Sequence, residues 1–178
     1  MALLWVMPLT AALVYADQLS KLWAVAYLNL GDLPVEWIPG VINFKLHYNT
    51  GIGWSMLEGQ YWIFVPLSVL ISLFFVVVLL RSPLRKKWWF DLICALILSG
   101  AIGNLIDRIG CGKVTDFISF AFMDFPTFNV ADCCVVVGAI ALFVAILFGM
   151  KKVEDVPLRT LLFNIPVKNK EKQDGSDV

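Results

Sequence analysis

The sequence contains few charged residues and no excess of charge of either sign. Charged side chains make up 16% of its 178 residues, with 14 basic and 14 acidic residues, and hydrophobic residues make up 60%. A soluble domain has about 25% charged and about 45–50% apolar residues. The even charge gives no support for nucleic-acid binding, and the shortage of charge beside the hydrophobic excess predicts a membrane protein.

The sequence also has little of what a metal site or a disulfide framework needs. His47 is the only histidine, and the cysteines Cys94, Cys111, Cys133 and Cys134 form no CxxC pair or other spacing typical of metal ligands. We therefore expect no metal, no cofactor and no disulfide framework. Cysteine is common as a small apolar residue of buried helices, and this role is expected here.

Four segments are apolar over the roughly 20 residues that a helix needs to cross a bilayer. They are Leu3–Tyr27, Tyr61–Leu80, Trp88–Ile109 and Asn129–Gly149. The first lacks the basic start and the small-residue cleavage site of a signal peptide, so we expect it to be retained. The sequence thus predicts a mainly α-helical membrane protein with four transmembrane helices over residues 1–150, followed by a polar cytoplasmic tail over residues 151–178.

Basic residues mark one side of this predicted membrane protein. Arg81, Arg85, Lys86 and Lys87 follow the second segment, and Lys151 and Lys152 follow the fourth. Because cytoplasmic connections carry such an excess of Lys and Arg, both termini are expected in the cytoplasm and the other two connections outside. In a bacterium the chain would be a multi-pass protein of the inner membrane, in contact with lipid, with its outer connections in the periplasm.

Both outer connections have structure of their own. In the first, apolar and polar residues alternate from Ile42 to Asn49 after a Pro39-Gly40 turn, which predicts a small outward-facing β-element over about residues 33–55. The second contains an aromatic-rich stretch over about residues 117–128, which is too short to span. An interfacial segment at headgroup level is expected there.

Polar residues are predicted to gather at one depth. With a helix rise of about 1.5 Å per residue, Asp17 lies about 21 Å and Asn104 about 24 Å above the cytoplasmic starts of their helices, in the outer part of a core about 30 Å thick. Asp132 lies in the first turn of the last helix, and Asp116 in the connection before it. Asn104, Asp107 and Arg108 share one helical face, as do Asn129 and Asp132, and Asp17 and Lys21.

Asp116 and Asp132 are the first candidates for chemistry. Ionised carboxylates near a membrane are costly, so two of them at one level need a reason. A pair of carboxyl groups that cannot both ionise easily supplies one general acid and one general base from a single residue type.

Structural explanations exist for several of these residues. Asp17 with Lys21, and Asp107 with Arg108, contain their own counter-charges and are open to being structural ion pairs. Asp132 suits the positive end of the last helix and Asn129 suits its cap, although neither explains Asp116. A serine–lysine arrangement of Ser20 and Lys21 also stays open.

Two other classes of function remain as alternatives. Membrane carboxylates often mark ion paths, which would make the chain a small carrier or proton-relay protein. The inner halves of the later segments contain few polar residues, which disfavours such a path. The second alternative is a non-catalytic membrane scaffold, in which the two aspartates would be dispensable.

Five motifs follow one another in the chain. They are Asp17-Gln18-Leu19-Ser20-Lys21, Asn49-Thr50-Gly51, Gly100-Ala101-Ile102-Gly103-Asn104-Leu105-Ile106-Asp107-Arg108, Val114-Thr115-Asp116-Phe117 and Phe128-Asn129-Val130-Ala131-Asp132. In this order, in a protein of this size with four predicted spans, they resemble the lipoprotein signal peptidase family, also called signal peptidase II. The chain departs from the family's usual pattern at Ile52-Gly53-Trp54 and at Ser99-Gly100.

The resemblance implies an aspartic-type intramembrane endopeptidase. It would cleave signal peptides from diacylglyceryl-modified prolipoproteins just before the lipidated cysteine, with its active site at the periplasmic side. Nothing in the sequence requires more than a monomer. The implied roles are catalysis for Asp116 and Asp132, substrate binding for Asn49, Gly51, Asn104, Arg108 and Asn129, and structural support for Asp17, Lys21 and Asp107.

Overall fold

The computed structural model describes residues 2–51, 61–81, 87–149 and 160. The helices are α1 (Ala2–Tyr27), α2 (Tyr61–Arg81), α3 (Trp88–Cys111) and α4 (Val130–Gly149), and the strands are β1 (Val35–Ile38), β2 (Ile42–Asn49) and β3 (Val114–Phe120). Apart from residue 160, the predicted tail lies outside the described residues, as do residues 52–55 of the predicted β-element.

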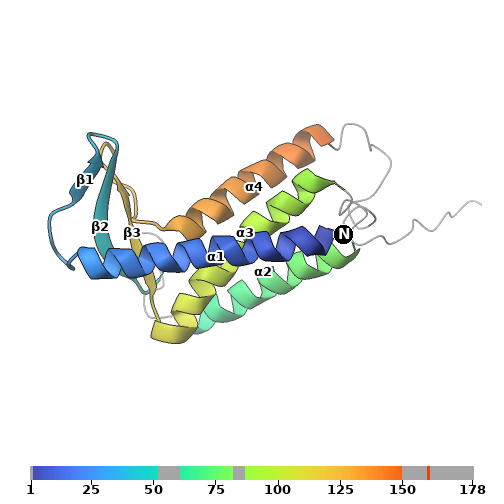
Figure 1. Cartoon of the computed structure of the whole chain (residues 1–178), viewed down its shortest axis with the longest axis horizontal. Coiled ribbons are helices and arrows are strands. Elements are labelled where there is room, and N and C mark those ends of the chain that lie inside the picture. Colours follow the sequence, from blue (N-terminus) through green and yellow to red (C-terminus); the bar gives the residue numbers. More distant parts are fainter. Residues whose placement is uncertain (1, 52–60, 82–86, 150–159, 161–178) are drawn as a thin grey trace, which may run out of the picture.

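The four helices run along one long axis, and the three strands gather at one end of them (Figure 1). The N-terminus lies at the opposite end, so α1 and α3 run toward the sheet whereas α2 and α4 run away from it (Figure 1). Helix α3 is central, because it packs against α1, α2 and α4. The ends of α1 and α3 therefore lie near the sheet together with the start of α4.

Three helical segments of the described residues are long and apolar enough to cross a membrane: Ile63–Arg81, Trp88–Cys111 and Val130–Leu147. Of these segments, Trp88–Cys111 has 61% of its residues buried and each of the other two has 17%, which agrees with the central position of α3. Helix α1 is 26 residues long but is not among the three. The fourth predicted span therefore stays a prediction.

Bare glycines let the helices approach closely beside the sheet end of α3. A Cβ added at Gly100 would overlap the carbonyl oxygen of Ala131 in α4, and one added at Gly103 would lie 2.7 Å from the Oδ2 atom of Asp17 in α1. Gly112 follows the last residue of α3 and caps the helix. Its φ of 70° is readily adopted by glycine, and its backbone N–H donates to the carbonyl oxygen of Arg108. The chain turns there and enters β3 two residues later.

The β-element predicted from the alternation is present as an antiparallel sheet of order β1-β2-β3. Strand β2 buries Leu46 and exposes His47, as its alternation indicates. Leu46 and Phe117 of β3 form an apolar cluster with Ala24 near the end of α1, which attaches the sheet to the helices. Trp23 adds an edge-on contact to Phe44, with their ring centroids 5.2 Å apart.

The third strand overlaps the segment predicted to be interfacial, residues 117–128, whose position at headgroup level stays a prediction. Their first four residues belong to β3, which pairs with β2 so that Asp116 lies opposite His47 and Thr115 opposite Tyr48. Phe128 then returns to β3, where its N–H donates to Ile118 and its carbonyl accepts from the N–H of Ile118. Asp116 is therefore held in a sheet rather than in a free connection, because a partner strand distant in sequence is available to it.

Candidate active site

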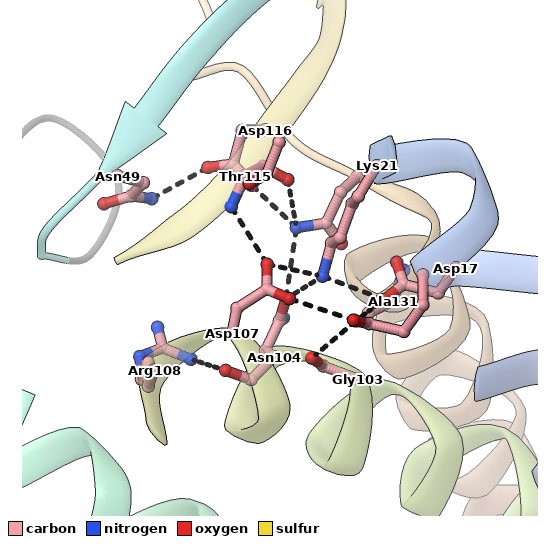
Figure 2. Close-up of polar contacts among 12 residues, drawn as sticks. Asp17, Lys21, Asn49, Gly103, Asn104, Asp107, Arg108, Thr115, Asp116 and Ala131 are labelled. Carbon is pink, nitrogen blue, oxygen red and sulfur yellow. Dashed lines mark hydrogen bonds and ion pairs between the residues drawn. The ribbon is translucent and has the colours of Figure 1, made fainter. Parts of the chain in front are cut away.

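All ten residues singled out from the sequence belong to one connected network of hydrogen bonds and ion pairs at the sheet end of the helices. Figure 2 shows most of it, with contributions from α1, α3, β3 and the end of β2. Asn104 lies in the middle. Its Nδ2 atom donates to Asp132 at 2.7 Å, and its Oδ1 atom accepts from Lys21 at 3.2 Å and from Asn129 at 3.1 Å.

Asn129 and Asp132 cap the start of α4 reciprocally. The backbone N–H of Asp132 donates to the Oδ1 atom of Asn129 at 2.9 Å, and the backbone N–H of Asn129 donates to the Oδ2 atom of Asp132 at 3.2 Å. This is the geometry of a capping box, formed here by Asn and Asp. The cap expected at Asn129 is therefore present, with Asp132 as its partner, but the capping leaves the other oxygen of Asp132 and the amide nitrogen of Asn129 for other partners.

The amide nitrogen of Asn129 reaches the second aspartate. It donates to the Oδ1 atom of Asp116 at 2.6 Å, and Asn49 donates to the Oδ2 atom of Asp116 at 3.0 Å. Asn49 also accepts the backbone N–H of Gly51 at 2.9 Å, which fixes the turn that follows β2. Asn129 thus contacts both aspartates at once.

The two aspartates differ in their surroundings. Asp116 is only 1% exposed, whereas Asp132 is partly exposed. Burial, and after it the negative charge of Asp132, raise the pKa of Asp116 to about 7, although hydrogen bonds from Asn49 and Asn129 and the charge of Lys21 act in the opposite direction. Asp116 is therefore able to hold a proton near neutral pH.

Three charged residues form ion pairs between the helices. Lys21 forms ion pairs with Asp17 at 2.8 Å and with Asp107 at 3.1 Å. The ion pair of Asp17 and Lys21 is thus present, whereas the carboxylate of Asp107 is paired with Lys21 instead of with its neighbour Arg108. Arg108 donates to the carbonyl of Asn104 at 3.3 Å and lies over the ring of Phe64, 5.4 Å from its centroid.

Sequence reasoning missed two side chains that the structure brings to this site. Gln18 of α1 donates hydrogen bonds to both Asp17 and Asp107. The ring of Phe64 in α2 makes a cation–π contact with the guanidinium of Arg108. Gln18 is three residues before Lys21, so the helical spacing that grouped Asp17 with Lys21 could also have found it. Nothing in the sequence pattern of α2 distinguishes Phe64 from its other apolar residues.

Within the described part of the chain, no group of three or more His, Cys, Asp or Glu side chains is arranged to hold a metal ion. All four cysteines are free; Cys94 and Cys134 are buried, and Cys111 and Cys133 are exposed. What the site offers chemically is a pair of carboxyl groups, one buried and one partly exposed, surrounded by amide donors and one arginine.

Comparison with known proteins decides the family. Residues 9–148, which include every residue of the network, match the family model described as signal peptidase (SPase) II. The chain belongs to the signal peptidase II family. It is 37% identical to the lipoprotein signal peptidase of Enterococcus faecalis over 147 residues, which cover 83% of this chain and 90% of that relative. It is 40% identical to the lipoprotein signal peptidase of Lactococcus lactis subsp. cremoris strain MG1363 over 137 residues, covering 75% and 87% of the two chains.

The fold agrees with this membership in the signal peptidase II family. A bacterial membrane enzyme solved by the in meso method at 2.3 Å resolution superposes with a TM-score of 0.78 at 28% identity, covering 86% of this chain and 93% of that one. A second such structure, at 1.9 Å resolution, gives a TM-score of 0.74 at 30% identity, covering 80% and 92%. The chain is therefore a peptidase by family, and its fold is similar to that of bacterial membrane enzymes.

Proposed function

We propose that this protein is an aspartic endopeptidase of the bacterial inner membrane that removes signal peptides from diacylglyceryl-modified prolipoproteins, cutting just before the lipidated cysteine. The observation that carries the proposal is the pairing of Asp116 with Asp132 through Asn129, with the pKa of Asp116 raised to about 7. A protonated and an ionised carboxyl group side by side are what acid–base hydrolysis of a peptide bond requires.

In this mechanism Asp132 is the ionised member at rest. It lies in the first turn of α4, accepts two hydrogen bonds from backbone and amide N–H groups, and faces the positive end of the helix dipole. Because it is partly exposed, water reaches it from the outer side. Asp116 is the protonated member, since burial and the charge of its partner oppose its ionisation.

The two carboxyl groups exchange roles during one turnover. Asp132 takes a proton from water while the water oxygen attacks the scissile carbonyl carbon, and Asp116 gives its proton to the carbonyl oxygen. When the C–N bond of the tetrahedral intermediate breaks, Asp132 returns its proton to the leaving nitrogen. Asp116 then recovers a proton from one hydroxyl group as the new carboxyl group forms, which restores the starting state.

The neighbouring polar groups bind the substrate backbone. Arg108 is held from one side by the ring of Phe64 and by the carbonyl of Asn104, and we assign its other N–H donors to peptide carbonyls. Asn49 and Gly51 form the turn beside Asp116, and their position at the end of β2 suits contact with an extended peptide. Asn104 and Asn129 present amides to both aspartates and to the peptide between them.

The membrane arrangement follows from the two ends of the molecule. We assign α1 as a fourth span, with both termini in the cytoplasm and the sheet at the periplasmic surface. Arg81 and Lys87 lie at the helix ends away from the sheet, where the positive-inside rule expects them. The exposed Phe122, Met123 and Phe125 beside β3 suit the headgroup level, so the lipid chains of a substrate stay in the bilayer while water enters from outside. One chain supplies every group in this mechanism, and we propose a monomer.

A cleavage assay with purified protein tests the proposed substrate class. The substrate is a prolipoprotein peptide carrying diacylglyceryl-cysteine, compared with the same peptide without lipid, and the Enterococcus faecalis relative serves as the active control. We expect a product whose N-terminal residue is the lipidated cysteine, identified by mass spectrometry, and far slower cleavage of the unmodified peptide. No cleavage while the control is active, or cleavage elsewhere in the peptide, would refute the proposal. A carrier or proton relay would release no peptide.

A further inference from the structure

The residues that precede the two aspartates are held in the same way. The backbone N–H of Thr115, before Asp116, donates to the Oδ2 atom of Asp107 at 3.0 Å. The backbone N–H of Ala131, before Asp132, donates to the Oδ1 atom of Asp17 at 2.8 Å. Each aspartate is therefore attached to a second carboxylate through its neighbour's backbone, as the contacts of Thr115 and Asp107 in Figure 2 illustrate.

The two supporting carboxylates are joined by two bridges. Lys21 reaches Asp17 at 2.8 Å and Asp107 at 3.1 Å. The Nε2 atom of Gln18 reaches the Oδ2 atom of Asp17 at 3.2 Å and the Oδ1 atom of Asp107 at 3.0 Å. It also lies 3.2 Å from the carbonyl oxygen of Gly103, which ties the bridge to the backbone of α3.

The charges explain why a second bridge is needed. The side chains of Asp17, Lys21 and Asp107 are 1%, 4% and 9% exposed, so water screens them little. Two carboxylates share one ammonium group, which leaves one negative charge in excess and a repulsion between Asp17 and Asp107. A neutral amide donor stabilises both carboxylates without adding another buried charge that would itself need a partner.

We propose that Gln18 is a positioning residue that, together with Lys21, fixes the spacing of Asp116 and Asp132 by holding Asp17 and Asp107 together. We call the set Asp17, Gln18, Lys21 and Asp107 the carboxylate clamp. The proposal rests on the proposed roles of the two aspartates and deepens them. Gln18 acts on the reaction only through Thr115 and Ala131, and it does not touch the substrate.

Two substitutions of Gln18 separate its donor from its size. Gln18→Leu removes the donor and keeps a side chain of similar length. Gln18→Glu keeps the shape and, when protonated, one O–H donor, but places a third negative charge in the clamp when ionised. Leu19→Ala is the matched control, because Leu19 is the next residue of α1 and its side chain is 46% exposed.

The kinetic readout is the split between kcat and KM across the pH range. We expect Gln18→Leu to lower kcat by about tenfold, which corresponds to about 1.4 kcal/mol, while KM stays within about twofold. The activity of Gln18→Glu relative to wild type should be highest at acidic pH and fall as the pH rises, because ionisation removes its donor. Leu19→Ala should match wild type throughout.

A titration of the Asp116 carboxyl group tests whether the clamp sets the spacing of the two aspartates, and it does not depend on catalysis. The side-chain carboxyl of Asp116, labelled with ¹³C and assigned with Asp116→Asn, is followed by NMR in wild type and in Gln18→Leu. If the clamp sets the spacing, its loss lets Asp132 move away, and Asp116 titrates at lower pH in the variant. An unchanged titration overturns the proposal, as does an equal, pH-independent loss of kcat in the Leu and Glu variants. If wild type cleaved no prolipoprotein, the proposed function would fail while this titration still tested the clamp.

Discussion

Asn129 donates a hydrogen bond of 2.6 Å to Asp116 while its own Oδ1 atom caps the helix that carries Asp132. The side chain of Asn129 therefore joins Asp116 in β3 to the start of α4, which carries Asp132. The cap stabilises the start of α4, and we propose that the amide donor orients Asp116 for the reaction. These two functions of Asn129 are separable by substitution.

Replacing Asn129 by Ser should separate them. A serine hydroxyl still caps α4, but it cannot also supply the amide N–H to Asp116, so we expect Asn129→Ser to be more stable than Asn129→Ala and to have kcat reduced about tenfold or more. Asn129→Ala should lose the cap as well and unfold about 1 kcal/mol more easily. Thermal unfolding and cleavage rates measured on the same preparations check this. Equal stability of the Ser and Ala variants would contradict the capping role.

The pH dependence of kcat/KM should report the proton on Asp116. As the pH rises through about 7, Asp116 loses the proton that the mechanism needs, so activity should decline there. Asn49 donates a hydrogen bond to Asp116 and thereby lowers the pKa of Asp116. Asn49→Ala should therefore move this decline of kcat/KM, the alkaline limb of the pH profile, to higher pH. Asn29→Ala, at an exposed asparagine bound to Asp32, is the control and should leave the limb in place. A limb that moves to lower pH in Asn49→Ala would contradict the assignment.

The raised pKa of Asp116 also makes a prediction for stability. The ordinary value is 3.8 and the folded value is about 7, so as the pH rises the unfolded chain releases this proton first. The contribution of this group to folding is then complete below about pH 4 and is lost by about pH 7. Asp116→Asn cannot titrate, so its melting temperature should decline less between these values than that of wild type. Melting curves in one detergent across this range measure the difference, and parallel declines would rule out a buried, protonated Asp116.

Gly103 should be intolerant of even one methyl group. Its Cβ would lie 2.7 Å from the Oδ2 atom of Asp17 and 3.1 Å from the Cβ of Ala131, both of which belong to the support of Asp132. We expect Gly103→Ala to destabilise the protein by about 1–3 kcal/mol and to lower kcat. Gly110→Ala is a matched control on the same helix, since nothing lies within 4 Å of its added Cβ. If both variants behaved as wild type, the close approach of α1 and α4 to α3 would not matter for activity.

Local patterns in the sequence were enough to predict much of this site. The alternation from Ile42 to Asn49 identified β2, and helix rise brought Asp17, Asn104 and Asp132 to one level, where the structure joins them. Both patterns depend only on residues near each other in the chain. The five motifs then placed the chain in its family, and the family model covers residues 9–148.

Pairings between distant segments could not be predicted in this way. The strand that holds Asp116 forms because β2 is available some 70 residues earlier, and a run as short as Val114–Phe120 carries no sign of that partner. The partner of Asp107 is Lys21 on another helix instead of its neighbour Arg108, since the direction of each helix face is set by packing. Gln18 was passed over because its amide carries no charge, although it bonds to two charged groups.

In the proposed mechanism Asp116 and Asp132 together hydrolyse the peptide bond. The most direct measurement is the single-turnover cleavage rate of a diacylglyceryl-modified prolipoprotein by Asp116→Asn, Asp132→Asn and Asp124→Asn, each checked for folding. Asp124 lies exposed just after β3, so its variant controls for the loss of a carboxylate near the site. We predict that the first two variants cleave about 100-fold more slowly or worse, and that Asp124→Asn cleaves like wild type. Wild-type cleavage by a folded Asp116→Asn or Asp132→Asn variant would contradict the proposed catalytic pair.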